Sequence, residues 1–172
     1  MIYIKILALL IFLLILDYML FSPNFTLLLL NITESYKNCD GIDNMMTELK
    51  GNNFKEKYID LIKKFKYKNR GFGIAYTPKE FMKNNYKGVC RDFTKSVCCL
   101  ANKYNIKTRL LLLTNENITL FNLLFNNSSK KGHIVCEVNV NNKWYVFDMD
   151  GIEFENNYKN DFNNILLVDL YE

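Results

Sequence analysis

Hydrophobic side chains recur at helical spacing between residues 90 and 104. At about 100° per residue, apolar and charged side chains separate onto opposite faces of a helix. The apolar face carries Phe93, Val97, Leu100, Ala101 and Tyr104, and the other carries Arg91, Asp92, Lys95 and Lys103. The pattern predicts an amphipathic helix, with Cys90 in its first turn on the apolar, inward side.

Two further helices are predicted upstream of this one. Residues 54–67 repeat an apolar stripe at helical spacing with charged side chains between, and we interpret the stripe as core. Thr77 followed by Pro78 is typical of an N-cap with proline at the first helical position. A short helix is therefore predicted from this point through Met82.

Strands are predicted in the second half of the chain. Residues 106–114 are rich in leucine, which indicates a buried strand. The runs 133–140 and 143–148 are rich in β-forming residues and are joined by two asparagines, which tolerate positive φ, so they predict a two-residue hairpin. Residues 115–131 show no firm period and are expected to form a loop that helps to shape a substrate cleft.

The hairpin turn also predicts a register. The expected pairs are Val140 with Lys143, Val138 with Tyr145, and Cys136 with Phe147. Because side chains alternate between faces, the face that bears Cys136 is largely apolar and is expected to be the buried one. His133 and Asp148 share the other face as diagonal neighbours, about 7–8 Å apart and within reach of an imidazole–carboxylate hydrogen bond.

The first 21 residues form a hydrophobic segment whose charged side chains are Lys5 and Asp17. About 20 apolar residues span a bilayer core of about 30 Å, so we expect a membrane helix. A cleaved signal peptide is the alternative, but residues 17–21 offer no small side chains for cleavage, and an uncleaved anchor is favoured. A buried core helix fits less well, because the segment is apolar on every face.

Residues 1–35 are accordingly interpreted as an anchor and linker, and residues 36–172 as one soluble domain. Pro23 ends the first helix, and residues 25–32 are apolar but too short to cross a bilayer alone. The few flanking charges slightly favour a cytoplasmic N-terminus. A single-pass membrane protein with an extracytoplasmic domain is the resulting expectation.

Composition and charge narrow the possible partners. A chain of 172 residues is long enough for one domain with a real core. Its net charge is +4, but the lysines are scattered, so a nucleic-acid partner is not expected. The chain has an odd number of cysteines, five, and a single histidine. We therefore expect neither a disulfide framework, nor a metal site, nor a cofactor.

Three polar residues are candidates for chemistry. At a helix N-terminus the macrodipole favours the thiolate of Cys90. A cysteine can equally pack as a small hydrophobe, which is how we interpret the other four, Cys39, Cys98, Cys99 and Cys136. Likewise, His133 alone could be an incidental strand histidine, and Asp148 alone could simply end a strand. Together they indicate a thiolate–imidazolium nucleophile with an orienting acid.

The same residues carry a family resemblance. The blocks are residues 88–93, 104–109, 132–138 and 144–148, and over residues 75–150 they resemble the core of the transglutaminase-like superfamily, in the order Cys, His, Asp. The resemblance implies a papain-like α+β fold in which the cysteine helix packs on an antiparallel sheet. It implies Cys90 as nucleophile, His133 as base and acid, and Asp148 as the orienting residue.

Other positions differ from the family pattern or are less well defined. Val135 stands where many relatives have an aromatic residue, and Met149 replaces a frequent proline. Tyr76 and the backbone N–H of Cys90 are candidates for stabilising an oxyanion. Asp92 is expected to cap a helix and not to take part in catalysis.

The resulting hypothesis is a membrane-anchored thiol enzyme that acts on protein or peptide amide bonds through a thioester. Because the chain is short for a member with accessory domains, hydrolysis by a protease or amidase is favoured over transamidation. The alternative is a catalytically silent binding module of the same fold at the membrane. Retention of all three polar residues argues against that alternative.

Overall fold

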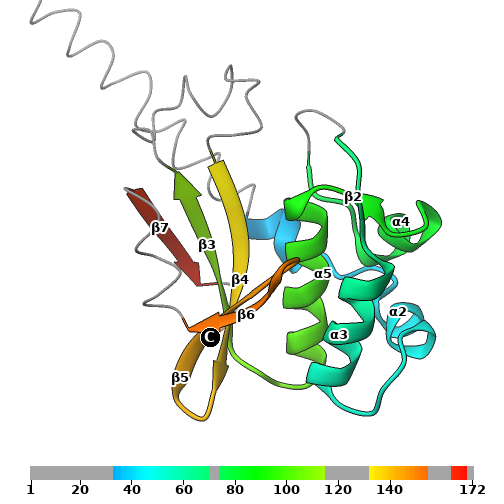
Figure 1. Ribbon diagram of the computed structural model, residues 1–172, viewed down its shortest axis with the longest axis horizontal. Helices are drawn as coiled ribbons and strands as arrows, with labels where there is room; N and C mark the ends of the chain where they lie inside the picture. Colours follow the sequence, from blue (N-terminus) through cyan, green and yellow to red (C-terminus); the bar gives the residue numbers. More distant parts are fainter. Residues whose placement is uncertain (1–32, 70–73, 115–131, 155–163, 170–172) are drawn as a thin grey trace, which may run out of the picture.

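An antiparallel sheet packs against a layer of helices in the computed structural model, which describes residues 33–69, 74–114, 132–154 and 164–169 (Figure 1). The helices are α2 (Ile42–Glu48), α3 (Phe54–Lys64), α4 (Pro78–Lys83) and α5 (Cys90–Lys103), and residues 33–37 are also helical. The sheet strands are β3 (Thr108–Thr114), β4 (Gly132–Val140), β5 (Lys143–Asp148), β6 (Gly151–Phe154) and β7 (Asn164–Asp169), in the order β6-β5-β4-β3-β7. The mixed architecture of helices and an antiparallel sheet agrees with the expected fold class.

Helix α5 lies at the centre of the domain. It packs against β4 on one side, while α2, α3 and α4 contact it elsewhere (Figure 1). The amphipathic division expected for this helix is therefore wrong at Asp92 and Lys95, which are 0% and 1% exposed. The non-helical segment before α4 covers this side, because Tyr76 donates its backbone N–H to Asp92 and Lys95 donates to the carbonyl of Ala75 at 3.4 Å.

The predicted helices upstream of α5 are present with changed bounds. Helix α4 begins as expected, because Thr77 and Glu80 form a capping box. The side chain of each residue accepts a hydrogen bond from the backbone N–H of the other. Helix α3 ends at Lys64, not at residue 67, since Phe65 is extended and β1 (Lys66–Tyr67) pairs in parallel with β2 (Lys87–Gly88). Helix α2 was not predicted, although Ile42, Met45, Met46 and Leu49 recur at helical spacing within it and just after it.

The hairpin has the predicted register. Val140 pairs with Lys143, Val138 with Tyr145 and Cys136 with Phe147. Asn141 and Asn142 both adopt positive φ, of 53° and 61°. The expectation of a single buried face is wrong, however, because Val135 and Val146 on the other face are 0% exposed and cluster with leucines of β3. A leucine-rich strand that is buried on both faces is consistent with this arrangement.

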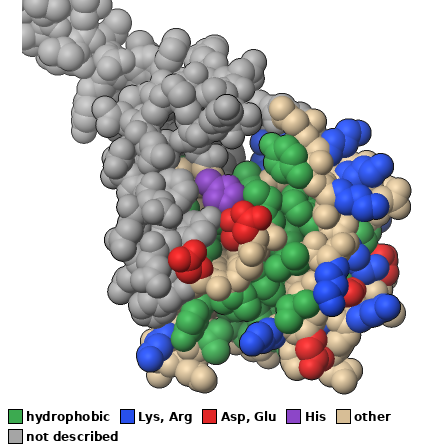
Figure 2. All heavy atoms as spheres, viewed as in Figure 1, with side chains coloured by type: hydrophobic (Ala, Val, Ile, Leu, Met, Phe, Trp, Pro, Cys, Tyr) green, Lys and Arg blue, Asp and Glu red, His purple; other side chains and the backbone are tan. Residues whose placement is uncertain are grey.

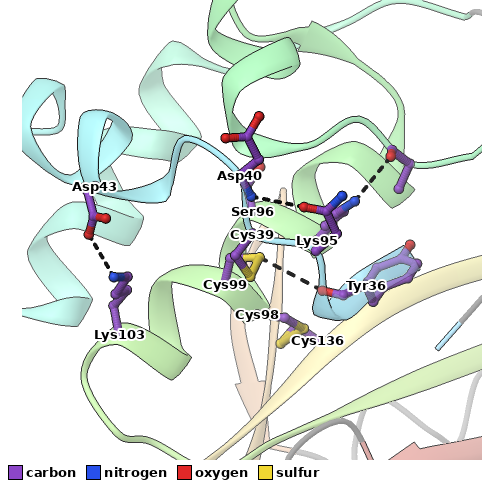
Figure 3. Close-up of a disulfide and its surroundings, with 12 residues drawn as sticks. Tyr36, Cys39, Asp40, Asp43, Lys95, Ser96, Cys98, Cys99, Lys103 and Cys136 are labelled. Atoms are coloured by element: carbon purple, nitrogen blue, oxygen red, sulfur yellow. Dashed lines mark hydrogen bonds and ion pairs between the residues drawn. A yellow bond between two sulfur atoms is a disulfide. The ribbon is translucent and has the colours of Figure 1, made fainter. Parts of the chain in front are cut away.

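Two disulfides cross-link the domain, in contrast to the expectation from the odd number of cysteines. Cys39 is bonded to Cys99, and Cys98 is bonded to Cys136 (Figure 3). Neighbours on a helix point about 100° apart, so Cys98 reaches β4 while Cys99 reaches the segment before α2. The cysteine left as a free thiol is Cys90.

The membrane helix predicted for the start of the chain lies outside the described residues, as does the loop predicted over residues 115–131. Among the helices that the structure describes, none is both long enough and apolar enough to cross a bilayer.

Candidate active site

Cys90 is the first residue of helix α5, and Asp92 holds that end of the helix in place. The Asp92 carboxylate accepts hydrogen bonds from the backbone N–H groups of Val89, at 2.9 Å, and Tyr76, at 2.8 Å. Asp92 thus caps the helix, as expected, and also ties it to the segment before α4. These contacts fix the position of the Cys90 backbone.

Gly88 provides the space that this cap requires. A Cβ atom at Gly88 would lie 2.6 Å from Oδ2 of Asp92 and 3.0 Å from a ring carbon of Phe81. Both distances are shorter than ordinary van der Waals contacts, so a side chain at this position would displace the capping carboxylate. Steric exclusion of a side chain therefore explains why position 88, two residues before Cys90, is a glycine.

His133, at the start of β4, and Asp148, at the end of its neighbour β5, meet beside α5. His133 Nε2 lies 2.8 Å from Asp148 Oδ2, and the two side chains are 20% and 5% exposed. The other Asp148 oxygen accepts the backbone N–H of Met149 at 2.7 Å. A proline at 149 has no N–H, so the departure from the family pattern gives Asp148 an additional donor. Figure 2 shows the histidine at the molecular surface.

Cys90 and His133 form an electrostatically coupled pair. Burial raises the pKa of the Cys90 thiol, but the hydrogen bond and charge of His133, together with backbone hydrogen bonds from Ile134 and Arg91, outweigh this effect, and the net pKa is lowered. Burial lowers the pKa of His133, but Asp148 and Cys90 together raise it to about 10. Since Nε2 faces Asp148, Nδ1 is the ring nitrogen left for the sulfur. The arrangement favours a thiolate beside an imidazolium.

Thr94 links the nucleophile helix to the histidine strand. Its hydroxyl donates a 2.7 Å hydrogen bond to the carbonyl of Ile134, the residue after His133. We did not predict this contact from the sequence. The available signal is a hydroxyl residue on the apolar face of the helix, one turn after Cys90, because a buried hydroxyl generally needs a partner.

Tyr58 makes a second contact with the site, to Asp148, that was not predicted from the sequence. Its hydroxyl lies 2.5 Å from the Asp148 carbonyl oxygen, whereas the sequence pattern placed Tyr58 in a stripe of core side chains. It is also buried, as core residues are, at 1% exposure. The signal was its hydroxyl, since a buried tyrosine usually finds a hydrogen-bond partner.

The two candidates for stabilising an oxyanion, Tyr76 and the backbone N–H of Cys90, both lie near the start of helix α5. Tyr76 is half-buried against the core, and its backbone N–H is bound to Asp92. The N–H of Cys90 belongs to the first helical turn, whose N–H groups have no partner within the helix. Both roles stay predictions. Within the described ranges, no three His, Cys, Asp or Glu side chains are grouped so that they could hold a metal ion.

Comparisons with known proteins agree with the resemblance seen in the sequence. A family model described as a transglutaminase-like domain matches residues 29–168. Among solved structures, a candidate cysteine protease from Cytophaga hutchinsonii is similar at 16% identity and a TM-score of 0.46, covering 72% of this chain and 45% of that protein. The structure of Rad4–Rad23 bound to a 6-4 photoproduct lesion is similar at 11% identity and a TM-score of 0.30, covering 72% of this chain and 35% of the other.

The chain thus spans less than half the length of either structural neighbour. A comparison with curated proteins gives no match.

Proposed function

Because the chain belongs to the transglutaminase-like domain family, we propose that it is a cysteine-dependent enzyme that acts on amide bonds through Cys90, His133 and Asp148. The observation that carries the proposal is the coupling of the one free thiol to a histidine whose Nε2 is 2.8 Å from a buried carboxylate. A thiolate nucleophile, an acid–base group and an orienting acid are the parts that acyl transfer through a thioester requires.

In the proposed mechanism, the Cys90 thiolate attacks the amide carbonyl and forms a carbon–sulfur bond. The tetrahedral intermediate collapses with cleavage of the carbon–nitrogen bond, and the His133 imidazolium gives its proton to the leaving amine. Water then attacks the thioester while His133 takes a proton from it, and cleavage of the carbon–sulfur bond releases the acid. Asp148 stays ionised and holds the ring in position.

Hydrolysis is the outcome that we propose over transamidation. The two reactions differ in whether water or an amine attacks the thioester. The His133 side chain is 20% exposed, so water can reach the imidazole that would activate it. The proposed substrate is a protein or peptide amide, and no nucleic-acid partner, metal or cofactor is part of the mechanism.

We further propose that residues 1–21 anchor the protein in a membrane, with the domain on the extracytoplasmic side. Two disulfides support this location, because disulfides persist mainly in oxidising compartments. Tyr36, in the helical segment that follows the proposed anchor, donates a 3.2 Å hydrogen bond to the carbonyl of Arg91. Residues 33–37, with which the described part of the chain begins, therefore contact the domain near the Cys90 end of α5. Labelling of intact cells with a membrane-impermeant maleimide tests the orientation.

Alkylation by iodoacetamide under non-reducing conditions tests the proposed nucleophile. Four of the five cysteines are in disulfides, so the folded protein should take up one label, on Cys90. The rate near pH 7 should exceed that of the urea-unfolded chain, since the folded thiol has the lower pKa. Cys90→Ala should abolish labelling, and His133→Ala should slow it to the unfolded rate or below, because burial then raises the pKa of the thiol.

A peptide-library digestion followed by mass spectrometry tests the reaction itself. Cleaved amides that are absent with Cys90→Ala would support hydrolysis, whereas incorporation of a biotinylated amine would support transamidation. If Cys90 reacts no faster than an unperturbed thiol and neither product forms, the enzyme hypothesis fails. The silent binding module would then be the better description.

A further inference from the structure

The hydroxyl of Tyr58 lies between two carbonyl oxygens of the turn that follows Asp148. It is 2.5 Å from the carbonyl oxygen of Asp148 and 2.6 Å from that of Gly151. These two residues pair across the ends of β5 and β6, so one hydroxyl from helix α3 contacts both ends of the turn. Burial, with the charges of Asp148 and Asp150, raises the pKa of Tyr58. The hydroxyl therefore stays a donor at neutral pH.

This turn determines where the Asp148 carboxylate points. One carboxylate oxygen is bonded to His133 and the other to the N–H of Met149. An aspartate side chain has only two rotatable bonds, so its carboxylate follows any movement of the backbone that carries it. A hydrogen bond that holds the Asp148 carbonyl thus also limits the position of the carboxylate relative to the imidazole.

The Tyr58 ring connects the same turn to the nucleophile helix. Its centroid lies 4.9 Å from that of Phe147, which precedes Asp148, with the rings nearly perpendicular. It also lies 6.2 Å from the ring of Phe93, one turn along α5 from Cys90. A single buried side chain of α3 therefore packs against the elements that carry the thiol and the acid.

We propose that Tyr58 is a positioning residue for the active site, acting through Asp148 on the Cys90–His133 pair. The proposal rests on the proposed function, because it assigns to Tyr58 the orientation of that site's acid. A role confined to core packing would affect only stability. A positioning role must also change the protonation behaviour of the thiol.

The test is the pH dependence of Cys90 alkylation in the Tyr58→Phe variant of the full chain. Phenylalanine keeps the ring but removes the donor, which should leave Asp148 less well aligned with His133. The imidazolium is then less stabilised, so the midpoint of the alkylation profile should rise by about 0.5–1 pH unit, a three- to tenfold lower rate on the acidic side. Tyr86→Phe is the matched control. Its tyrosine is also buried, but its ring contacts Phe81, so its midpoint should not move.

A double-mutant cycle with Asp148→Asn shows whether the effect passes through the acid. If Tyr58 acts through Asp148, the Tyr58→Phe/Asp148→Asn variant should have the same midpoint as Asp148→Asn alone. Additive shifts would overturn the proposal, and so would a wild-type midpoint in Tyr58→Phe. Thermal unfolding shows whether each variant is still folded, so that a loss of folding is distinguished from a loss of the alignment between Asp148 and His133.

The outcomes distinguish this proposal from the proposed function. If Asp148→Asn itself leaves the Cys90 profile unchanged, the acid assigned in the proposed function is wrong. If Asp148→Asn shifts the profile while Tyr58→Phe does not, the proposed function stands and the role of Tyr58 is purely structural.

Discussion

The Thr94 hydroxyl and the Ile134 carbonyl oxygen are 2.7 Å apart, and their hydrogen bond joins helix α5 to strand β4. Thr94 is one turn beyond Cys90 and Ile134 is adjacent to His133. The spacing between the sulfur and the imidazole is thus held by a contact that involves neither residue directly.

Replacement of Thr94 by valine should weaken this alignment. Valine has nearly the same shape but leaves the Ile134 carbonyl without its donor, which should lower the free energy of unfolding by about 1 kcal/mol. The alkylation rate of Cys90 at pH 6 should also fall, while Thr94→Ser should retain it. Ser96→Ala is the control, because the Ser96 hydroxyl bonds to the Asp92 carbonyl within the same helix. Equal alkylation rates for the valine and serine variants would contradict the prediction.

The rate of amide cleavage should fall at high pH, where His133 loses its proton. The active pair needs a Cys90 thiolate and a His133 imidazolium, so it exists between the lowered pKa of Cys90 and the pKa of His133 at about 10. Activity should fall as the pH rises through about 10, because the leaving amine loses its proton donor. Alkylation should persist there, since it needs the thiolate alone. Parallel pH profiles of cleavage and alkylation provide the check, and a joint decline of both would count against the assignment.

The raised pKa of His133 also predicts that the free energy of unfolding depends on pH. The pKa of His133 is higher in the folded protein than its ordinary value of 6.5. Its contribution to stability is therefore complete below about pH 6.5 and is lost as the pH rises through about 10. Because the lowered pKa of Cys90 changes stability in the opposite direction, the test uses Cys90→Ala: urea unfolding at pH 6, 8 and 10 should show a decline that is smaller in Cys90→Ala/His133→Ala. A decline of the same size in the variant would assign it to other groups.

Gly88→Ala should destabilise the start of helix α5. The added Cβ would lie 2.6 Å from Oδ2 of Asp92, and relief of such overpacking typically costs about 1–3 kcal/mol. Cys90 alkylation should slow in the same variant, because the cap sets the position of the first turn. Asp92→Ala removes the atom involved, so the double variant should lose less stability than the sum of the two single changes. Strict additivity would indicate that Gly88 is required for another reason.

The two disulfides should contribute differently to the site. Loss of either one should lower the free energy of unfolding by about 2–4 kcal/mol, since each closes a long loop. Only Cys98–Cys136 joins α5 to the strand of His133. The paired variant Cys98→Ala/Cys136→Ala should therefore also shift the pH profile of Cys90 alkylation upward, whereas Cys39→Ala/Cys99→Ala should leave it in place. Identical profiles in the two paired variants would show that the site does not depend on this cross-link.

Local patterns predicted the parts of this protein that depend on neighbours along the chain. The helix from Cys90, the Thr77 cap and the register of the Asn141–Asn142 hairpin follow from periodicity and turn chemistry, which operate over a few residues. The register in turn predicted that His133 and Asp148 would be within hydrogen-bonding reach, because alternation along paired strands is a local property.

Contacts between distant segments could not be predicted in this way. Burial of Asp92 and Lys95 depends on the segment before α4 that contacts them, and the disulfides depend on which sulfur atoms meet in space. The proximity of Tyr58 to Asp148 joins residues 90 positions apart. The spacing of hydrophobic residues predicts that such a tyrosine is buried. It does not predict which group the tyrosine hydroxyl contacts.

By itself, therefore, the sequence determined helices α3, α4 and α5, strand β3, the β4–β5 hairpin and the identities of the candidate thiol, imidazole and carboxylate, but not α2, β1, β2, β6 or β7. Only the tertiary structure decided how helix, strand and turn are held so that these groups meet. The physical reason is that secondary structure follows from local backbone preferences and side-chain periodicity. The alignment of an active site instead depends on a small number of long-range hydrogen bonds, ring contacts and cross-links, each set by the packing of the whole domain.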